Sequence, residues 1–352
     1  MKRPAPTPID RRRFMELLGA AGLVAQSGIL GLPLSGCGSK PDETGEDDER
    51  FYFAVISDVH LKDGSVDSGN DEVLTQTLEI LEHYEVPVEL ILVAGDLLDD
   101  LPSDDADHYE QSEGTALHQA QEILDACSIP VHIAMGNHDY YLQGSSLENN
   151  LSDDYPAREA LYQQALGMPA PWYAFEHNGI RFIALNSMQP DARAGWVPEA
   201  CGSFGEEQLS WLEEQLADGT PCVLFFHHPL ATDVFVDSGY SFIMPFEVPR
   251  AEGGYDKYEG TVYEGWTDPI YALLEQHADQ VMAIFVGHGH AWVADDWAGI
   301  PVLEADSVGN AFPGTYIEVD GEEQPMRYHL IEVNLTQGSF SVYNRAWIPY
   351  DA

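Results

Sequence analysis

The sequence predicts a layered α/β domain, and three observations support this fold class. Short apolar runs alternate along the chain with stretches that have helical spacing. Clusters of Asp, Asn and His follow five of the apolar runs, which is where α/β sheets place their sites. With 352 residues, 44% of them hydrophobic, the chain can bury a full core. Disordered, collagen-like and disulfide-scaffold classes are therefore excluded.

The alternation is regular in the first part of the chain. Residues 51–57 are a short apolar run that suits a buried strand, and residues 71–84 carry apolar side chains at helical spacing. A second strand is predicted over 89–94, a second helix over 111–127 and a third strand over 130–135. Strands that alternate with helices in this way indicate a layered α/β arrangement.

The rest of the chain continues the pattern and ends in a predicted hairpin. Residues 329–333 and 339–344 alternate between apolar and polar side chains, with a Thr-Gln-Gly turn signal at 336–338 between them. The elements expected before this hairpin are strands over 180–186, 221–226 and 281–286 and helices over 206–217 and 268–279.

The charge balance is strongly acidic. The chain has 60 Asp and Glu against 15 Lys and Arg, a formal net charge of −45, and no basic patch is visible. Because nucleic-acid binding depends on Lys and Arg that neutralise phosphates, nucleic acid is not an expected partner. Two interpretations of the acidity stay open. One is adaptation to high salt, where ions screen an acidic surface; the other is an acidic exported protein from an ordinary habitat.

Residues 1–36 are predicted to be an export signal. The N-terminus is basic, and Arg11 and Arg12 followed by Phe14 resemble a twin-arginine signal. The weakly apolar stretch over 17–34 is short and polar for a membrane span, which needs about 20 mainly apolar residues. It suits the apolar region of a signal peptide instead.

The signal ends in Leu-Ser-Gly-Cys at 34–37, which resembles a bacterial-type lipobox. On this interpretation Cys37 is the lipidated first residue of an exported protein. The protein is then anchored by lipid alone to the outer face of a membrane, periplasmic or at the cell surface. An incidental Cys37 in a signal cleaved elsewhere is the alternative. Residues 37–50 are polar and acidic and are predicted to be a flexible tether before the folded domain of 51–352.

Five short polar clusters carry the chemistry of this sequence. Alone, the Asp-x-His, Gly-Asp-x-x-Asp and His-His-Pro clusters are weak signals, because each also occurs in turns or at strand ends for structural reasons. Gly-Asn-His-Asp and Gly-His-x-His are stronger, since packing rarely needs two polar ligands beside a tight glycine turn. The order and position of all five indicate a functional site. The clusters are at 58–60, 95–99, 136–139, 227–229 and 287–290.

The residue types in these clusters indicate a metal site. Asp, His and Asn are ligands of borderline and hard divalent or trivalent cations, and the absence of Cys argues against a structural zinc site. The clusters supply enough ligands for two ions. Two cations about 3.5–4 Å apart can bind and orient a phosphate ester and turn a bridging water into hydroxide. Such cations would also let an acidic protein bind an anionic substrate.

The array of clusters resembles that of the calcineurin-like metallophosphoesterase superfamily, from about residue 51 to the chain end. The resemblance implies a four-layer α-β-β-α sandwich, with two central mixed β-sheets flanked by helices and two metal ions at the strand ends. Fe, Zn and Mn are all chemically acceptable. The implied ligands are Asp58, His60 and His290 for the first metal and Asn137, His227 and His288 for the second, with Asp96 as the bridging carboxylate.

Two further residues are assigned to catalysis by the same resemblance. His138 resembles the histidine that protonates the leaving group, and Asp99 resembles the carboxylate that orients it. A hydrogen bond to the Asp99 carboxylate would raise the basicity of His138. His227 is preferred over His228 as the ligand, because the family's ligand is the His directly after the strand.

The nearest resemblance within the superfamily is to the class III cyclic-nucleotide and glycerophosphodiester phosphodiesterase branch. Purple acid phosphatases have a tyrosinate where this chain has Asp99, and protein Ser/Thr phosphatases have Asp-Arg-Gly there. The expected function is hydrolysis of small phosphate esters, phosphodiesters in preference to phosphomonoesters. A phosphomonoesterase of the same superfamily and a non-catalytic binding lipoprotein are the alternatives, and the intact ligand set argues against the second.

Aromatic residues near the clusters are candidates for the mouth of the site. Tyr140 and Tyr141 follow Gly-Asn-His-Asp directly and are expected to line it. The long aromatic segment over 230–266 is either a packed excursion over the sheet edge or a lid.

Overall fold

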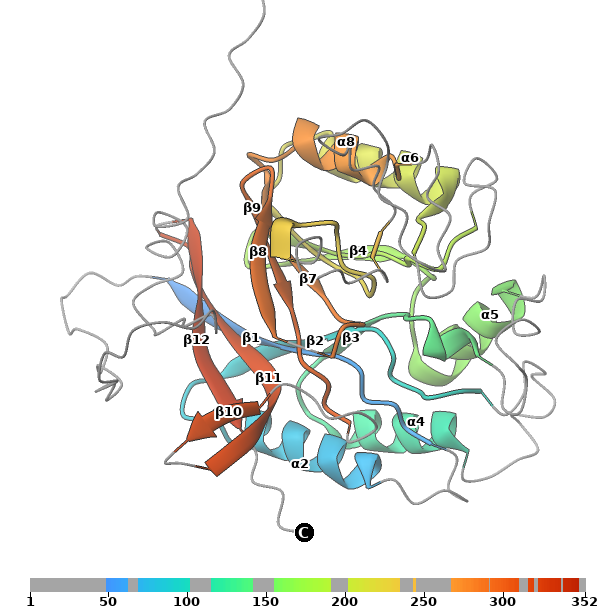
Figure 1. The fold of residues 1–352 in the computed structure, drawn as a ribbon, viewed down its shortest axis with the longest axis vertical. Helices are drawn as coiled ribbons and strands as arrows, with labels where there is room; N and C mark the ends of the chain where they lie inside the picture. Colours follow the sequence, from blue (N-terminus) through green and yellow to red (C-terminus); the bar gives the residue numbers. More distant parts are fainter. Residues whose placement is uncertain are drawn as a thin grey trace, which may run out of the picture.

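The computed structural model describes residues 49–62, 69–101, 115–141, 155–190, 202–234, 243–244, 267–290, 292–309, 316–319, 322–336 and 338–347. It contains two six-stranded β-sheets with helices on the outside of each (Figure 1). Both sheets combine parallel and antiparallel pairs. The predicted pair of mixed sheets flanked by helices is therefore confirmed.

The first sheet has the order β10-β11-β1-β2-β3, with β12 paired to β11. Its parallel centre, β1 to β3, is connected by helices α2 (Asn70–Glu82) and α4 (Ala116–Ala126). The apolar run of β1 is buried along almost its whole length, as expected for a strand covered on both faces. The strands are β1 (Arg50–Ile56), β2 (Val88–Ala94), β3 (Val131–Ala134), β10 (Tyr316–Val319), β11 (Glu322–Asn334) and β12 (Ser339–Trp347).

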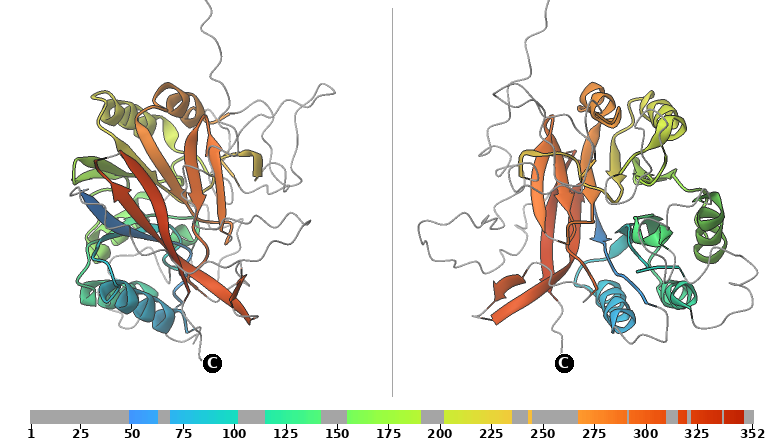
Figure 2. Two further views of the ribbon diagram at one scale, coloured as in Figure 1. Left: turned by 90° about the vertical axis from the view of Figure 1, so that its left-hand side faces the viewer. Right: turned by 45° about the vertical axis from the view of Figure 1, so that its right-hand side comes forward.

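The second sheet has the order β4-β5-β6-β7-β9-β8. Its central strands β5, β6, β7 and β9 are parallel, and the edge strands β4 and β8 are antiparallel to their neighbours. Helices α6 (Gly205–Leu216) and α8 (Ile270–Gln276) lie on its outer side (Figure 2). The strands are β4 (Tyr173–His177), β5 (Ile180–Ala184), β6 (Cys222–Phe225), β7 (Val281–Val286), β8 (Val293–Trp297) and β9 (Ile300–Glu304).

Aromatic side chains join the two sheets through the core. The ring of Phe53 on β1 makes edge contacts with Phe182 on β5, at 5.4 Å between centroids, and with Phe285 on β7, at 5.6 Å. All three side chains are buried, so the sheets pack face to face around them. A second cluster, which includes Leu212 of α6 and Leu274 of α8, fixes the outer helices on the second sheet. This rigid pair of sheets holds the loops at their ends in place.

Several elements differ from the prediction. The sequence patterns did not indicate α5 (Tyr155–Leu166), β4, β8, β9 or β10. Strand β8 carries Asp295 and Asp296 at the sheet edge, and β9 contains Pro301, so neither shows an apolar strand pattern. The terminal hairpin is confirmed by the antiparallel pairing of Asn334 with Ser339.

The predicted signal, the lipobox with Cys37 and nearly all of the tether lie outside the described residues. Strand β1 already begins at Arg50, the last residue of the predicted tether. Of the aromatic segment over 230–266, only 230–234 and 243–244 are described. Among the helices in the described ranges, none has the length and apolar character required to cross a bilayer.

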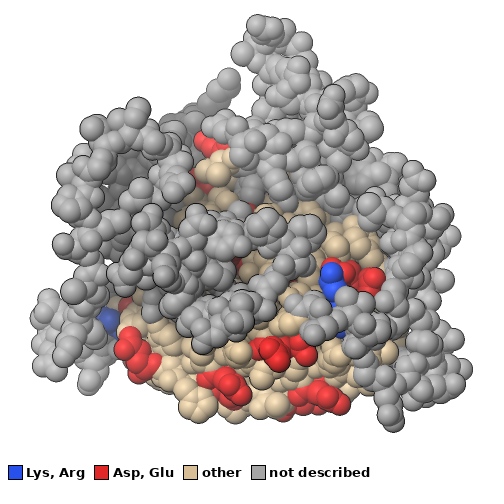
Figure 3. Space-filling model, turned by 60° about the horizontal axis from the view of Figure 1, so that its bottom comes forward, with Lys and Arg blue, Asp and Glu red and all other residues tan. Residues whose placement is uncertain are grey.

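The described surface over α2 and α4 is acidic (Figure 3). Both helices expose carboxylates: α2 at Asp71, Glu72 and Glu79, and α4 at Glu122 and Asp125. Neither helix has a basic residue in its last turn, where a cation would offset the helix dipole. The acidity inferred from composition is thus distributed over regular helical surface.

Candidate metal centre

Backbone hydrogen bonds bring the predicted polar clusters together at the strand ends. The loop after β1 pairs with the loop after β2, because the N–H groups of Asp58 and His60 donate to the carbonyl oxygens of Gly95 (3.1 Å) and Asp96 (3.0 Å). In the second sheet, the Gly287 N–H after β7 donates to the carbonyl of His227 after β6 at 2.9 Å. These clusters therefore begin where parallel strands end, and backbone hydrogen bonds between neighbouring loops hold them together.

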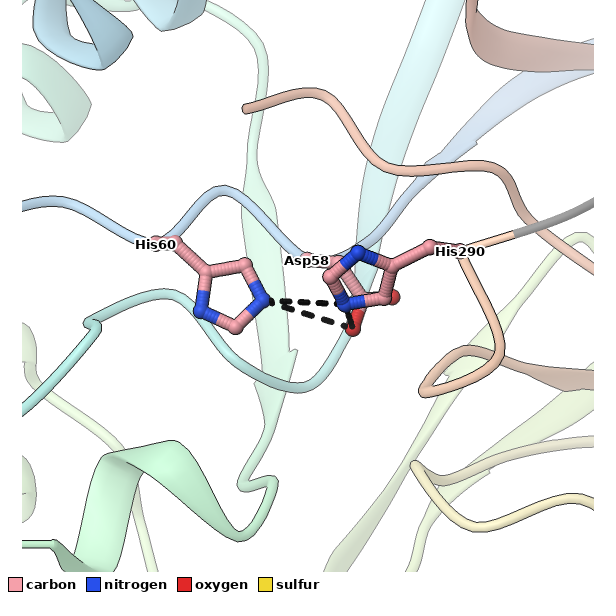
Figure 4. Close-up of side chains that lie close together, drawn as sticks. All are labelled: Asp58, His60 and His290. Atoms are coloured by element: carbon pink, nitrogen blue, oxygen red, sulfur yellow. Dashed lines mark hydrogen bonds and ion pairs between the residues drawn. The ribbon is translucent and has the colours of Figure 1, made fainter. Parts of the chain in front are cut away.

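The first group of side chains consists of Asp58, His60 and His290, which point toward one another (Figure 4). Asp58 Oδ1 lies 3.2 Å from His290 Nε2, and the Nε2 atoms of His60 and His290 are 3.1 Å apart. Asp58 and His60 are fully buried. A carboxylate oxygen and two imidazole nitrogens that converge in this way form a donor set for one cation.

The second group consists of Asn137, His227 and His288. His227 Nε2 lies 3.0 Å from Asn137 Oδ1 and 3.1 Å from His288 Nδ1. His227 Nδ1 donates to the Ala94 carbonyl oxygen at 2.9 Å, so in the neutral ring Nε2 carries a lone pair. A nitrogen lone pair, an amide oxygen and a second imidazole thus face one another, and a cation satisfies all three.

Asp96 joins the two groups. Its Oδ1 accepts the His138 N–H at 2.9 Å, which leaves Oδ2 directed toward both groups. Oδ2 lies 3.1 Å from His227 Nε2 and 3.8 Å from His60 Nε2. It is buried and accepts no hydrogen bond within the described part of the chain. A buried acceptor with this position fits a carboxylate shared by two cations, and the donor set as a whole fits a dinuclear centre.

The side chains of the adjacent histidines His227 and His228 have different partners. The Nδ1 atom of His228 lies 2.7 Å from the Ser187 hydroxyl. Its ring packs against that of His288, with 4.5 Å between centroids. His227, in contrast, has Nε2 between Asp96 and Asn137. The geometry favours His227 as the ligand, as the sequence analysis expects.

The backbone is strained at the candidate ligands. Seven non-glycine residues in the described ranges have positive φ, and two of them, Asn178 and Ala298, lie in hairpin turns. The other five are all candidate ligands: Asp58, His60, Asp96, His288 and His290, with φ between 51° and 75°. Such conformations cost roughly 1–3 kcal/mol each and cluster at functional sites. Packing alone gives no reason for five of them around one centre.

Glycines in the clusters are required by close approach. A Cβ on Gly95, where φ is +93°, would lie 2.4 Å from His227 Nδ1. A Cβ on Gly136 would lie 2.1 Å from Asp96 Oδ1. Both contacts are far inside van der Waals distance, so these positions accept only glycine while the loops keep their arrangement.

The pKa values of four buried side chains at the centre indicate which of them are charged when no cation is bound. Burial raises the pKa of Asp58 and of Asp96, but neighbouring histidines outweigh it and hold both pKa values well below the usual range. Burial lowers the pKa of His60 and of His227, and nearby carboxylates raise them to about 10 and about 9. Protons thus occupy His60 and His227 in place of cations, and metal binding must release them.

His138 lies beside the two groups but has its own partners. Its Nδ1 donates to the backbone carbonyl oxygen of Asp99 at 2.8 Å, while the Asp99 carboxylate is 3.8 Å away. The expected hydrogen bond to that carboxylate is therefore replaced by one to the carbonyl. The carboxylate lies nearer His60 Nδ1, at 3.4 Å, and Lys62 Nζ, at 3.6 Å. The tight turn that ends at Asp99 directs its carbonyl toward His138 and its side chain toward the loop after β1.

The two tyrosines after this cluster also differ. Tyr140 is only 1% exposed, and its hydroxyl donates to Glu159 Oε1 at 2.8 Å, so it lies in the core and does not line the mouth of the site as expected. Tyr141 is half-buried, with its ring 4.7 Å from that of His138 between centroids. The 3-10 turn η1 (His138–Tyr140) places successive side chains on different sides of the loop.

Asp139 has a larger structural role than its place in the Gly-Asn-His-Asp cluster indicated. Asp139 is fully buried and accepts hydrogen bonds from the Leu98 N–H (2.9 Å), the Gly136 N–H (2.8 Å) and the Tyr162 hydroxyl. It ties the loop after β3 to the loop after β2. The polar residue in a tight glycine loop was the signal that could have indicated this clamp.

The fold and the centre define a class of protein: an α/β protein of two stacked sheets with paired His/Asp groups at the strand ends. The chain belongs to the calcineurin-like phosphoesterase family, whose model matches residues 51–292. Family membership implies a metal-dependent phosphohydrolase, and the side-chain groups above agree with a binuclear site. A comparison with curated proteins found no match.

Solved structures similar to this chain include a purple acid phosphatase from yellow lupin, with 14% identity and a TM-score of 0.48. A putative 5′-nucleotidase from Staphylococcus aureus has 13% identity and a TM-score of 0.46. The matches cover 81% and 86% of this chain but only 50% and 54% of those chains. GAP50, the anchor in the inner membrane complex of Plasmodium, has 15% identity and a TM-score of 0.45, with 85% and 87% covered.

Proposed function

We propose that the protein hydrolyses small phosphodiesters in preference to phosphomonoesters, at a site that holds two cations. The observation that carries this proposal is the convergence of two ligand groups on Asp96 Oδ2, with His138 beside them. Two bound cations would offset the charge of the phosphate and activate a water molecule. The donor set accepts Fe, Zn or Mn.

The roles of the chain's own residues follow from their contacts. Asp58, His60 and His290 hold one cation, and Asn137, His227 and His288 hold the other. His138 donates its Nδ1–H to the Asp99 carbonyl, so Nε2 is the atom that delivers a proton to the departing oxygen. The Asp99 carboxylate, 3.4 Å from the outer nitrogen of His60, orients that ligand in the way outer carboxylates orient metal-bound histidines.

Charge supports the preference for diesters. A phosphodiester carries one negative charge, whereas a monoester carries about −1.5 to −2 at neutral pH. Within the described residues, the one lysine or arginine in an ion pair with a residue of this site is Lys62, and Asp99 balances its charge at 3.6 Å. A net charge of −45 also opposes the approach of a dianion more than that of a monoanion. The site therefore suits the less charged substrate.

Turnover of two model substrates tests the proposal. The purified protein is loaded with Mn, Zn or Fe separately, and kcat/KM is measured for bis-p-nitrophenyl phosphate and p-nitrophenyl phosphate. A higher value for the diester with the most active metal is expected. A higher value for the monoester would overturn the diester preference alone. If the protein binds metal but turns over neither compound, this would favour the non-catalytic binding lipoprotein and overturn the proposal that the protein is an enzyme.

We also propose that the protein is exported and lipid-anchored through Cys37, with residues 37–50 as tether. A single acyl chain binds a membrane only marginally, so stable anchoring needs more than one chain on this residue. The acidic charge gives no attraction to an anionic membrane. Anchoring is therefore expected to depend on Cys37.

In a cell-fractionation experiment, Cys37→Ser is expected to give soluble protein or protein with an uncut signal, with an active domain in either case. Cys127→Ser, which changes a free cysteine of the folded domain, is the matched control and should fractionate as wild type does. A processed Cys37→Ser protein that remains with membranes would show that the lipoprotein interpretation is wrong.

A further inference from the structure

Tyr141 is fixed at the edge of the candidate centre through its backbone. Its N–H donates to the His138 carbonyl at 3.1 Å, and its own carbonyl accepts the Leu101 N–H at 2.7 Å. The residue thus connects the loop after β3 with the end of the loop after β2. A tyrosine side chain has only two rotatable bonds before the hydroxyl, so a fixed backbone and packed ring give that hydroxyl a defined position.

The Tyr141 hydroxyl contacts a candidate ligand directly. It accepts a hydrogen bond from Asn137 Nδ2 at 2.9 Å. The other end of the same amide, Oδ1, lies 3.0 Å from His227 Nε2, inside the second ligand group. Asn137 is only 3% exposed, so water has little access to the amide nitrogen. With Nδ2 held outward by the hydroxyl, Oδ1 is the atom presented to a cation.

We propose that Tyr141 is a positioning residue of the second cation site, acting through Asn137 and not through contact with the substrate. This inference rests on the proposed function in one respect, that Asn137 is a metal ligand. An amide coordinates a cation through oxygen only, since its NH₂ group has no lone pair to offer. The hydroxyl satisfies the NH₂ group in the one orientation of Asn137 that ligation allows.

The expected size of the effect follows from this arrangement. Without the hydroxyl, the ligating orientation leaves a buried NH₂ donor unpaired, which disfavours that orientation. The variant therefore holds Asn137 less firmly in the conformation that binds the metal. Loss of partners of this kind typically weakens metal affinity about 10–100-fold. The first group, which Asn137 does not join, should keep its affinity.

The variant Tyr141→Phe removes the hydroxyl and keeps the ring that packs beside His138. Mn²⁺ is titrated by calorimetry into full-length folded protein that has been freed of metal. One of the two binding steps is expected to weaken about 10–100-fold while the other stays as in wild type. Tyr140→Phe is the matched control: it removes the neighbouring hydroxyl, whose partners Glu159 and Asn186 lie in the core, and should leave both steps unchanged.

A double-mutant cycle separates positioning from an independent role. In an Asn137→Ala background the hydroxyl has no amide to hold, so Tyr141→Phe should cause no further loss of Mn²⁺ affinity or of kcat/KM. Losses that multiply in the double variant would show that Tyr141 acts independently, and would overturn the proposal.

Metal binding by the wild-type protein distinguishes a failure of the Tyr141 proposal from a failure of the proposed function. If wild type binds two Mn²⁺ ions and Tyr141→Phe binds both with unchanged affinity, only the role of Tyr141 is wrong. If wild type binds no Mn²⁺, Zn²⁺ or Fe²⁺, both the role of Tyr141 and the proposed function are overturned.

Discussion

Asp96→Asn is expected to remove bound metal and activity together. Asp96 Oδ2 lies between the two ligand groups, 3.1 Å from His227 Nε2 and 3.8 Å from His60 Nε2. In the variant the amide oxygen can keep the hydrogen bond from the His138 N–H, so the loop keeps its anchor. The amide NH₂ group then faces the centre. The substitution thus removes a negative charge from the centre, and the NH₂ group repels cations. Activity should fall about 10²–10³-fold, the usual loss when one electrostatic contribution to the transition state is removed.

The measurement is the metal content of the purified variant together with its kcat/KM for the better nitrophenyl substrate. Asp218→Asn is the matched control, because Asp218 is an exposed carboxylate that pairs with Arg181 on the surface. That control should keep both metals and full activity. An Asp96→Asn protein that retains two metals per chain would contradict the bridging role.

His138→Ala is expected to separate metal binding from chemistry. Its Nδ1 is occupied by the Asp99 carbonyl, so the ring is oriented by the backbone and only Nε2 is left for proton transfer. The variant should retain both metals and lose about 10²–10⁴-fold in kcat. The loss should be smaller for substrates with good leaving groups such as nitrophenolate, because these depart without a proton.

Two outcomes would contradict this role for His138. Equal losses for good and poor leaving groups would exclude leaving-group protonation. Loss of a metal from the variant would show that His138 is a ligand. This outcome is geometrically feasible, because ligand atoms of His60, Asp96 and His138 also lie within 4.8 Å of one another. His132→Ala, a change at a partly buried histidine on β3, is the control for removing an imidazole from the same sheet.

Much of the candidate metal centre could be predicted, because the polar clusters that follow neighbouring parallel strands come together at one edge of the sheet. A parallel strand ends at the same edge of the sheet as its neighbour, so Asp58 after β1 and Asp96 after β2 are expected to meet if the two strands are parallel neighbours, as they are. The same reasoning brings His227 after β6 beside His288 after β7. Residue types then indicated a cation, because Asp, Asn and His converge without Cys.

Side-chain direction within the loops could not be predicted. A turn can present either the carbonyl or the carboxylate of Asp99 to His138, and the choice depends on backbone angles that the sequence pattern does not specify. For the same reason, Tyr140 and Tyr141 were indistinguishable as sequence but lie on opposite sides of η1. The choice of His227 over His228 rested on family resemblance, and the reason for it is the Ser187 partner of His228.

Strand β8 and helix α5 escaped prediction because charged residues interrupt their apolar patterns, although α5 also buries Leu161 and Tyr162 in the core. Strand β8 holds two aspartates at the border of the second sheet, and helix α5 buries Arg158 and Glu159. Arg158 donates to the Tyr140 carbonyl at 2.5 Å, and Glu159 accepts the Tyr140 hydroxyl. Buried charged residues of this kind interrupt the periodic apolar pattern by which a helix is recognised.

The number of metal ions bound by the active wild-type protein tests the central claim most directly. Elemental analysis of the purified enzyme, before and after treatment with a chelator and after reloading, should give two ions per chain in the active forms and none in the inactive one. Full activity in protein shown to contain no bound metal would contradict the account.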